Sequence, residues 1–356
     1  MSKNKAKIIG MTVLTSTVLL SGCGLFNTET QKKIDPPKTV TVKEGPVSKE
    51  TVSKETTAKE KEAAKNTVKT ELYLIDKDGY VVPQTLALPK TSSVAKQALE
   101  YLVANGPVTD LLPNDFRAVL PEDTEISVNI NKDNGVATVN FSKEFKNYQP
   151  EDEQKILQSV TWTMTQFDNV KSVKLKMNGH ELNEMPVNGT PISENLSRAT
   201  GINIDTNDVA DITNTKPVTV YYIGGEEGSY YYVPVTRRIS NTEKDNYAAV
   251  VNQLIQGPSG KSTLVSEFMS DVKLLEAPKY ENGTLTLNFN SNIYDSFKGK
   301  EISQSLLDML VLSLTEQQGV EKVAVEVNGK ADIKNDQGKK VSEPVTRPEK
   351  VNTGSY

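Results

Sequence analysis

The sequence predicts an α+β protein of two tandem two-layer α/β sandwich domains, each a small mixed sheet with two helices on one face. Two observations predict this class. The stretch GVATVNFSKEF at 135–145 returns as GTLTLNFNSNI at 283–293, and both alternate apolar and polar residues as a half-buried strand does. The elements on either side of the two stretches follow one another in the same order, which indicates a duplicated domain.

Each copy opens with two short β segments, ELYLIDKDGYVVPQ in the first and VTVYYIGGEEGSYYYVPV in the second. An amphipathic helix follows, within SSVAKQALEYLVANGP and NYAAVVNQLIQGP. Gly106 and Gly257 stand just past the end of this helix, each before a proline, and are expected to take the left-handed conformation. Ser240 and Glu243 are spaced as a capping box at the start of the second copy's helix.

The repeated strand is expected to be the second strand of a β-hairpin, because Asn-Gly pairs at 134–135 and 282–283 suit a tight turn. A longer helix is predicted next, over about 151–168 and about 301–317. A strand that ends in Asn-Gly closes each copy. The predicted order in both copies is therefore β-β-α-β-β-α-β.

The repeats divide the chain into six parts. These are a lipoprotein signal peptide (1–22), a lipid anchor with a disordered linker (23–70), a first domain (71–190), a linker (191–217), a second domain (218–334) and a polar tail (335–356). The segment 24–70 consists largely of polar residues with one aromatic side chain, Phe26. Such a composition cannot bury enough apolar surface to fold, so this segment is predicted to be a tether.

The single cysteine, Cys23, cannot form an internal disulfide. Lysines precede the largely apolar run Ile8–Leu20, which is shorter than the ~20 residues of a membrane span and fits a secretory signal. The small residues Ser21 and Gly22 before Cys23 resemble a bacterial lipobox. This implies transfer of a diacylglyceryl group to the Cys23 thiol and cleavage before it, which would anchor the chain in a membrane. The alternative is an ordinary signal peptide with a coincidental cysteine.

The folded part of the chain is acidic. The formal net charge is −5, and the signal peptide and the tether each carry +3, so residues 71–356 carry −11. An acidic body does not suit a polyanion, and nucleic acid is therefore not expected as a partner. A local basic patch within the fold would still be compatible with this balance.

No residue pattern points to catalysis. The one histidine, His180, has no partner set for a triad or a zinc site. QGPSGKST at 256–263 lacks the first glycine of a phosphate-binding loop, because Ile255 stands there. DKDG at 76–79 is expected to be a turn and not a calcium site. We therefore predict no catalytic residue, no cofactor and no metal, although two of the 46 acidic residues could still meet as a pair.

Aromatic residues allow two interpretations. Five tyrosines lie on two adjacent predicted strands of the second copy: Tyr221, Tyr222, Tyr230, Tyr231 and Tyr232. Cross-strand packing is favoured, and an exposed surface for a protein or glycan is the alternative. Trp162 lies off the main apolar stripe of its helix, so it is either a contact between domains or a partly buried residue.

Together, the lipobox at Cys23, the Gly-Pro pairs at 106–107 and 257–258, the VATVNF and LTLNF strands and the duplication resemble one family. It is the family of sporulation and germination lipoproteins with two tandem GerMN domains, and the likeness covers about 71–190 and 218–334. GerMN domains are similar to the ring-building modules of secretion machines. The resemblance implies Cys23 as the only site residue to carry over.

The resemblance also implies a non-enzymatic role in sporulation. Such proteins support assembly of the SpoIIIA–SpoIIQ channel from the space between the mother-cell and forespore membranes, on the extracytoplasmic face. The expected partners are the membrane, through diacylglyceryl-Cys23, and proteins of the channel complex. The runner-up is an envelope enzyme acting on peptidoglycan, for which cell-wall contact stays open. A solute-binding lipoprotein is a third class, which would need larger lobes and a ligand cleft.

Overall fold

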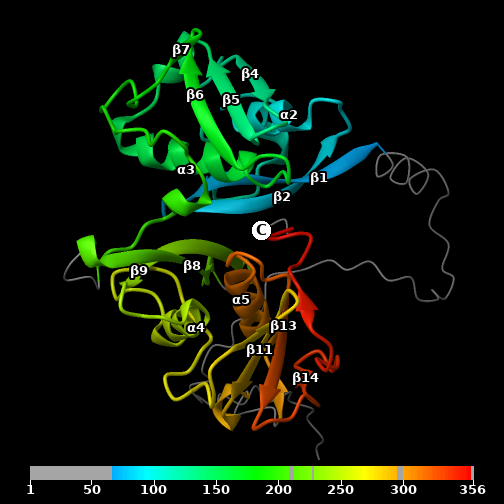
Figure 1. Ribbon diagram of the computed structural model, residues 1–356. Helices are drawn as coiled ribbons and strands as arrows, with labels where there is room; N and C mark the ends of the chain where they lie inside the picture. Colours follow the sequence, from blue (N-terminus) through cyan, green and yellow to red (C-terminus); the bar gives the residue numbers. More distant parts are fainter. Residues whose placement is uncertain (1–65, 208–211, 227, 295–299, 354–356) are drawn as a thin grey trace, which may run out of the picture. The chain divides into compact units, whose positions relative to one another are not determined.

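The structure is a computed structural model that describes residues 66–207, 212–226, 228–294 and 300–353. The predicted signal peptide, Cys23 and nearly all of the predicted tether lie outside the described residues. Both predicted copies lie within them, apart from residues 227 and 295–299, and are called here the first and the second repeat (Figure 1).

The first repeat holds two sheets and two α-helices. Its strands are β1 (Thr67–Asp76), β2 (Val81–Pro89), β3 (Phe116–Arg117), β4 (Ile126–Ile130), β5 (Val136–Phe141), β6 (Ser172–Met177) and β7 (His180–Glu181), and its helices are α2 (Val94–Glu100) and α3 (Glu153–Met164). One sheet has the order β2-β1-β3 and the other has the order β4-β5-β6-β7. Strands β5 and β6 are parallel while the pairs on either side are antiparallel, so this second sheet is mixed, as predicted.

The second repeat follows the same plan. Its elements are β8 (Thr215–Gly224), β9 (Tyr231–Ser240), α4 (Asn246–Gln256), β10 (Lys279–Glu281), β11 (Thr284–Phe289), β12 (Glu301–Ile302), α5 (Gln304–Leu314), β13 (Lys322–Val327), β14 (Lys334–Asn335) and β15 (Val345–Thr346). The mixed sheet has the order β10-β11-β13-β15, with β11 and β13 parallel. Strands β8 and β9 form a separate antiparallel hairpin, and β12 pairs with β14.

Short 3₁₀ turns connect these elements. They lie at Thr109–Leu111, Lys143–Lys146, Pro150–Asp152, Arg198–Thr200, Ile212–Asn214 and Ser291–Ile293. The turn at Pro150–Asp152 leads directly into α3, so the first long helix begins two residues later than the sequence predicts.

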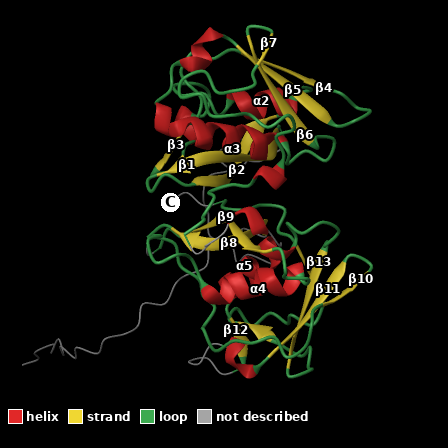
Figure 2. Ribbon diagram, turned by 60° about the vertical axis from the view of Figure 1, so that its left-hand side comes forward, coloured by secondary structure: helices red, strands yellow, loops and turns green. Residues whose placement is uncertain are grey.

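The α+β class with a mixed sheet in each repeat is confirmed, and the opening hairpin adds a layer that the prediction does not contain. Helix α3 contacts both β1 and β6, and α5 contacts both β8 and β13, so each helix lies between a hairpin and a mixed sheet (Figure 2). Helix α5 is buried at every position from Ser305 to Leu314. A helix that is buried all round needs cover on two sides, and the hairpin supplies the second cover.

The turns at the strand and helix ends agree with the sequence at some positions and differ at others. The turn before β11 is tight, with positive φ at Asn282 and Gly283, as predicted. Gly257 takes the left-handed conformation after α4 with a φ of 78°. The prediction for Gly106 is wrong, because Asn105 takes the positive φ there. Asparagine tolerates this region of φ and ψ better than other non-glycine residues, so the glycine is not required for the turn.

The predicted capping box at the start of α4 is also wrong. The N-cap residue is Asp245, whose carboxylate accepts hydrogen bonds from the backbone N–H groups of Tyr247 and Ala248. Ser240 ends strand β9 instead. The physical reason is position: only the residue directly before the first helical residue can reach the free N–H groups of the first turn.

Candidate functional site

The two repeats meet at a junction that two asparagines build. The Asn203 side-chain amide accepts a hydrogen bond from the backbone N–H of Val81 (2.8 Å) and donates to the carbonyls of Val81 and Pro234 (2.8 Å each). Val81 is in the first repeat and Pro234 is in the second. One side chain therefore ties strand β2 to strand β9.

Asn352 makes the equivalent contacts on the other repeat. Its amide accepts from the backbone N–H of Tyr232 (2.8 Å) and donates to the carbonyls of Tyr232 (2.9 Å) and Pro83 (2.7 Å). Both asparagines have a positive φ, 45° for Asn203 and 55° for Asn352. The two residues lie in the segments 191–217 and 335–356, which the sequence suggests only as linker and tail.

These contacts satisfy backbone groups at exposed strand edges. Strand β2 is at the edge of its sheet, and β9 forms a two-stranded sheet with β8 and one bridge from Arg237 to Asp205 of the connector. A buried N–H or C=O group without a partner costs free energy, and an uncovered edge invites pairing with other chains. The asparagine amides, together with the hydrogen bond from the Thr85 N–H to the Asn352 carbonyl (3.2 Å), cover these edges.

A buried ion cluster lies beside the asparagines. The Glu316 carboxylate, with a side chain only 9% exposed, binds Arg198 at 2.8 Å and 3.0 Å and Arg347 at 2.9 Å. Tyr221 donates its hydroxyl proton to Glu316 (2.9 Å). Burial by itself would raise the pKa of Glu316, but the two guanidinium groups outweigh it and hold the pKa below its usual value. Arg198 lies in the segment between the repeats and stacks on Trp162 of the first repeat, so the cluster links the second repeat to the first.

The cluster is not symmetric. Gln166 is the residue of the first repeat that corresponds to Glu316, 150 positions later. Each of the two follows the end of its helix, Gln166 after α3 and Glu316 after α5. Its amide instead accepts from the backbone N–H of Glu71 (2.9 Å) and donates to the carbonyls of Glu71 and Thr163 (2.6 Å each). Glu316 alone therefore binds both arginines.

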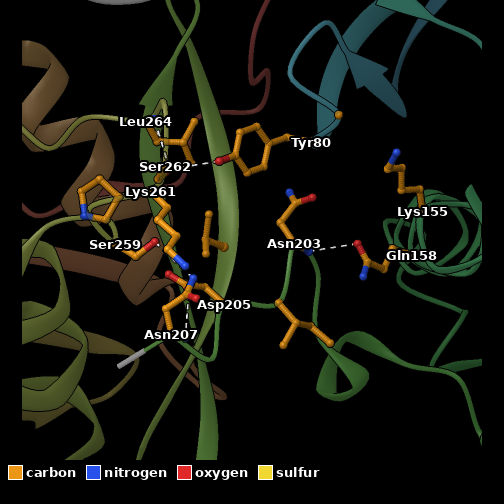
Figure 3. Close-up of a pocket in the computed structure, with 14 residues that line it drawn as sticks. Tyr80, Lys155, Gln158, Asn203, Asp205, Asn207, Ser259, Lys261, Ser262 and Leu264 are labelled. Carbon is orange, nitrogen blue, oxygen red and sulfur yellow. Dashed lines mark hydrogen bonds between the residues drawn. The ribbon is translucent and has the colours of Figure 1, made fainter. Parts of the chain in front are cut away.

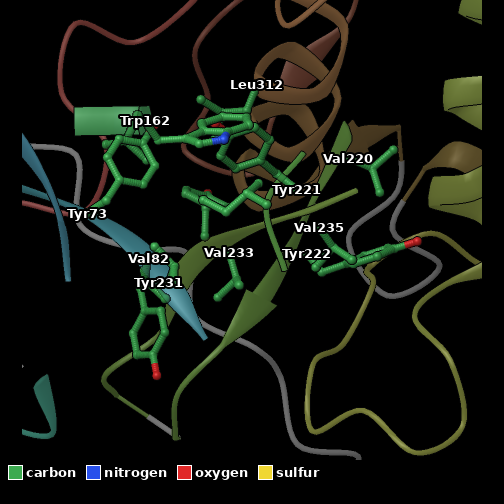
Figure 4. Packing of buried hydrophobic residues seen from close by; sticks show 14 of the residues in the cluster. Tyr73, Val82, Trp162, Val220, Tyr221, Tyr222, Tyr231, Val233, Val235 and Leu312 are labelled. Atoms are coloured by element: carbon green, nitrogen blue, oxygen red, sulfur yellow. The ribbon is translucent and has the colours of Figure 1, made fainter. Parts of the chain in front are cut away.

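Trp162 is part of this junction. It is fully buried, and its indole N–H donates to the Gly201 carbonyl (3.1 Å). The Arg198 guanidinium lies over the indole ring, 4.4 Å from the ring centre. The Tyr73 ring lies beside the indole, with the ring centres 5.6 Å apart (Figure 4). The sequence allowed Trp162 to be either a contact between domains or a partly buried residue. The contact between domains is correct, because Arg198 links Trp162 to Glu316 of the second repeat.

The tyrosines of β8 and β9 are buried, so the alternative of an exposed aromatic surface is wrong. Relative exposure is 3% or less for Tyr221, Tyr222, Tyr231 and Tyr232, and Tyr230 is partly buried. They do not pair with one another across the hairpin, since Tyr221 faces Pro234 and Tyr232 faces Ile223 in the register. Their hydroxyls reach polar partners inside the protein instead.

Two of these hydroxyls bind buried carboxylates. Tyr231 donates to Asp76 of the first repeat (2.9 Å), and Tyr232 donates to Asp308 on α5 (2.9 Å). Burial raises the pKa of Asp308 to about 6, although the hydrogen bonds from Gln304 and Tyr232 oppose this shift. Burial likewise raises the pKa of Asp76. The Asp76 carboxylate also accepts hydrogen bonds from the backbone N–H groups of Asp78 and Tyr80. The sequence predicts a turn and not a calcium site at 76–79.

A pocket of about 320 Å³ opens at the junction (Figure 3). Lys155 and Gln158 of α3 lie on one side, Ser259, Lys261 and Ser262 lie on the other, and the connector with Asn203 lies between them. The segment 256–263, which the sequence excludes as a phosphate-binding loop, thus supplies one wall.

The described residues that line the pocket do not include the paired carboxylates of a glycoside hydrolase. Asp205 is the one carboxylate among its described lining residues, and it lies 3.6 Å from the Arg237 guanidinium. Glycoside hydrolysis uses a pair of carboxylates on either side of the bond that breaks. His180 is exposed on β7 and does not line the pocket. Among the described residues, no group of three His, Cys, Asp or Glu side chains is placed to hold a metal ion.

Within the same described ranges, no helix has the length and apolar character to cross a membrane.

The geometry of the repeats and of their junction defines a class of protein: two tandem, similar α+β domains joined through a buried polar junction. A family model described as Germane, sporulation and spore germination, matches residues 71–183 and 219–332. The chain belongs to this family, and the resemblance inferred from the sequence is confirmed.

Two known proteins show the same relationship. The chain is 54% identical over 367 residues to the spore germination protein GerM of Bacillus subtilis (strain 168), and the match covers all of both chains. It is also similar to the solved structure of the tandem GerMN domains of the sporulation protein GerM from Bacillus subtilis. That match has a TM-score of 0.77 and 58% identity, and covers 81% of this chain and 100% of the other.

Proposed function

We propose that this protein is a lipid-anchored, non-enzymatic assembly component of sporulation that supports the SpoIIIA–SpoIIQ channel between mother cell and forespore. The observation that carries the proposal is the junction itself. Asn203, Asn352 and Glu316 join the two repeats through buried polar contacts, which favours a rigid double module over two loosely linked units. A rigid module with two similar faces suits docking onto neighbouring proteins.

The anchor in this proposal is Cys23, the only cysteine of the chain. A lipid on its thiol would hold the protein on the extracytoplasmic face of the membrane. The segment 24–70 has 47 residues, which span ~40 Å as a random coil and at most ~150 Å when fully extended. The double module could then reach partners well away from the membrane surface.

The anchor is tested by growing sporulating cells with labelled palmitate. The wild-type chain is expected to carry the label and to sediment with membranes, and Cys23→Ala is expected to lose both properties. Ser21→Ala serves as the matched control, because it keeps a small residue before the cysteine. A labelled, membrane-bound Cys23→Ala chain would contradict the anchor.

The docking role is tested by cross-linking the tagged wild-type chain in sporulating cells and identifying what is recovered with it. Channel proteins are expected among the products, and their absence would count against the proposal. The runner-up, an envelope enzyme, is tested separately by incubating the purified chain with peptidoglycan. We expect no soluble fragments, and their release would favour the enzyme.

A further inference from the structure

The junction pocket is lined by residues of both repeats, so a ligand in it would touch both at once. Its walls come from the tip of the β1–β2 hairpin, from α3, from β9 and from the loop 258–264, and the connector 203–207 lies between them. A hydrogen bond between the Tyr80 hydroxyl and the Ser262 hydroxyl (3.0 Å) joins the two sides at one end. Its volume lies at the lower end of the range of small-ligand sites.

The polar groups that face the pocket are mostly donors. Lys155 gives one hydrogen bond to Asp152 (3.0 Å) and keeps further N–H groups on its ammonium. Lys261 is exposed, and no carboxylate of the described residues forms an ion pair with it. The Gln158 carbonyl oxygen accepts from the Asn203 N–H (2.9 Å), which leaves the Gln158 NH₂ group as a donor.

The acidic residue in the pocket is already satisfied. One Asp205 oxygen accepts two hydrogen bonds from Asn207, at 3.0 Å and 2.8 Å. Its other oxygen lies 3.6 Å from Arg237, whose side chain is only 3% exposed. Of the charged side chains that line the pocket, Lys261 is therefore the one that forms no ion pair with a described carboxylate. The surrounding chain is acidic, with a net charge of −11 over residues 71–356. Lys261 is thus the local basic site that the overall charge conceals.

The remaining lining is apolar. Ile204, Val235, Pro258 and Leu264 line the pocket with the Tyr80 ring. Ile204 is 49% exposed, which is high for a large apolar side chain. A ligand that matches these walls has an anionic group next to an apolar group.

A phosphate does not fit the loop as well as a carboxylate does. Phosphate-binding loops present several free backbone N–H groups to the anion. In this loop the N–H of Ser262 donates to the Ser259 carbonyl (2.9 Å), and the N–H of Leu264 donates to the Ser262 hydroxyl (3.1 Å). These two N–H groups are therefore occupied, and the other walls of the pocket present the side-chain donors of Lys155 and Gln158. The acidic body also disfavours a polyanionic ligand.

We propose that the junction pocket binds a carboxylate-bearing peptide segment of a partner protein, an acidic residue beside an apolar one. The carboxylate binds the Lys261 ammonium, and the apolar neighbour contacts Ile204 and Pro258. This inference deepens the proposed docking function and rests on it for the existence of a protein partner. Because the pocket needs both repeats, a bound peptide also stabilises their pairing.

The test uses the purified, detergent-solubilised full chain and a fluorescent hexapeptide of alternating glutamate and leucine. Fluorescence anisotropy measures its affinity, and a photo-reactive version of the peptide maps its place by mass spectrometry. Cross-links are expected within 203–207 and 258–264. A peptide with glutamine in place of glutamate is expected to bind much more weakly, and equal binding by the two peptides would overturn the proposal.

Lys261→Gln is expected to weaken binding about fivefold, the effect of one partly exposed ion pair. Lys330→Gln is the matched control, since Lys330 is an exposed lysine that does not line the pocket. An equal loss in both variants would overturn the site. So would binding of inorganic phosphate at the same residues with no binding of the peptide.

The peptide-binding test can fail or succeed independently of the test of the proposed channel role. Peptide binding to the purified chain requires no channel and no sporulating cell. If the peptide binds at the pocket and cross-linking in cells recovers no channel protein, the docking site stands and the channel assignment fails. If channel proteins are recovered equally by wild type and Lys261→Gln and the peptide does not bind, the site fails alone.

Discussion

Asn203 and Asn352 stand 149 positions apart and make the same three hydrogen bonds to equivalent backbone groups. Val81 corresponds to Tyr232 in these contacts, and Pro234 corresponds to Pro83. Each asparagine thus binds its own repeat and reaches across to the other. The junction has the form of a two-fold dimer interface, in which one patch meets its own counterpart, contained within a single chain.

Asn352→Ala is expected to destabilise the protein by about 3 kcal/mol. The change leaves buried backbone groups of Tyr232 and Pro83 without partners and puts alanine in a left-handed conformation. Urea unfolding followed by circular dichroism measures the loss. Asn328→Ala is the control, because Asn328 has a positive φ of 49° but is exposed, so it should cost only about 1 kcal/mol. Equal losses in the two variants would contradict the role of the amide.

Glu316→Gln is expected to cost about 3 kcal/mol, because it leaves the half-buried Arg198 and Arg347 without their buried carboxylate. Urea unfolding at pH 7 measures the loss. Glu321→Gln, an exposed carboxylate a few residues along the chain, should change stability by less than about 0.5 kcal/mol. A small effect of Glu316→Gln would show that the ion cluster does not hold the junction.

The same residue predicts acid sensitivity. The pKa of Glu316 is lowered in the folded protein, so its stabilisation is present above the unfolded value of about 4.3 and is lost as the pH falls through the lower folded value. Unfolding measured at several pH values between 7 and 3 should therefore show a steeper loss of stability for wild type than for Glu316→Gln. Parallel curves would contradict this assignment.

Asp308 predicts the opposite dependence in a higher pH window. Its pKa is about 6 when folded and about 3.9 when unfolded, so the folded state holds the proton more tightly. Stability from this group is therefore highest at low pH and decreases by about 2 kcal/mol as the pH rises from about 4 to about 6. Asp308→Asn should remove this decrease, whereas Asp332→Asn, at an exposed position, should leave it unchanged. An unchanged pH profile in Asp308→Asn would contradict the prediction.

The two repeats are expected to unfold together. Trp162 is the only tryptophan and lies at the junction, so its fluorescence reports on the first repeat and on the contact with Arg198. Circular dichroism reports on both repeats. The two transitions in urea should coincide in wild type, as for a two-state protein. Two separate transitions in wild type would show that the junction contributes little coupling.

Much of the fold was predictable because it depends on local pattern. The alternation in VATVNF and LTLNF places Phe141 and Phe289 in the core, and both are fully buried. The duplication was evident because the same elements return in the same order. Patterns of period 2 and 3.6 report which face of an element is apolar, and this information is present in the sequence.

The position of the opening hairpins was less predictable. The sequence predicts two short β segments at the start of each copy, but it does not say which sheet they join. Trp162 carries one indication of this arrangement. A large apolar residue off the main apolar stripe of α3 indicates that the helix is covered on a second side. The structure supplies that cover from the hairpin and from Arg198.

The sequence by itself determined that there are two copies, the order of their elements and the alternation that fills their cores. Only the tertiary structure decided that Asn203 and Arg198, in a polar segment resembling a linker, meet β2, β9 and Glu316. Local periodicity records burial within one element, whereas a junction depends on partners from 31 to 269 residues apart along the chain. A polar side chain in a loop has the same sequence signature whether it faces water or a buried carboxylate.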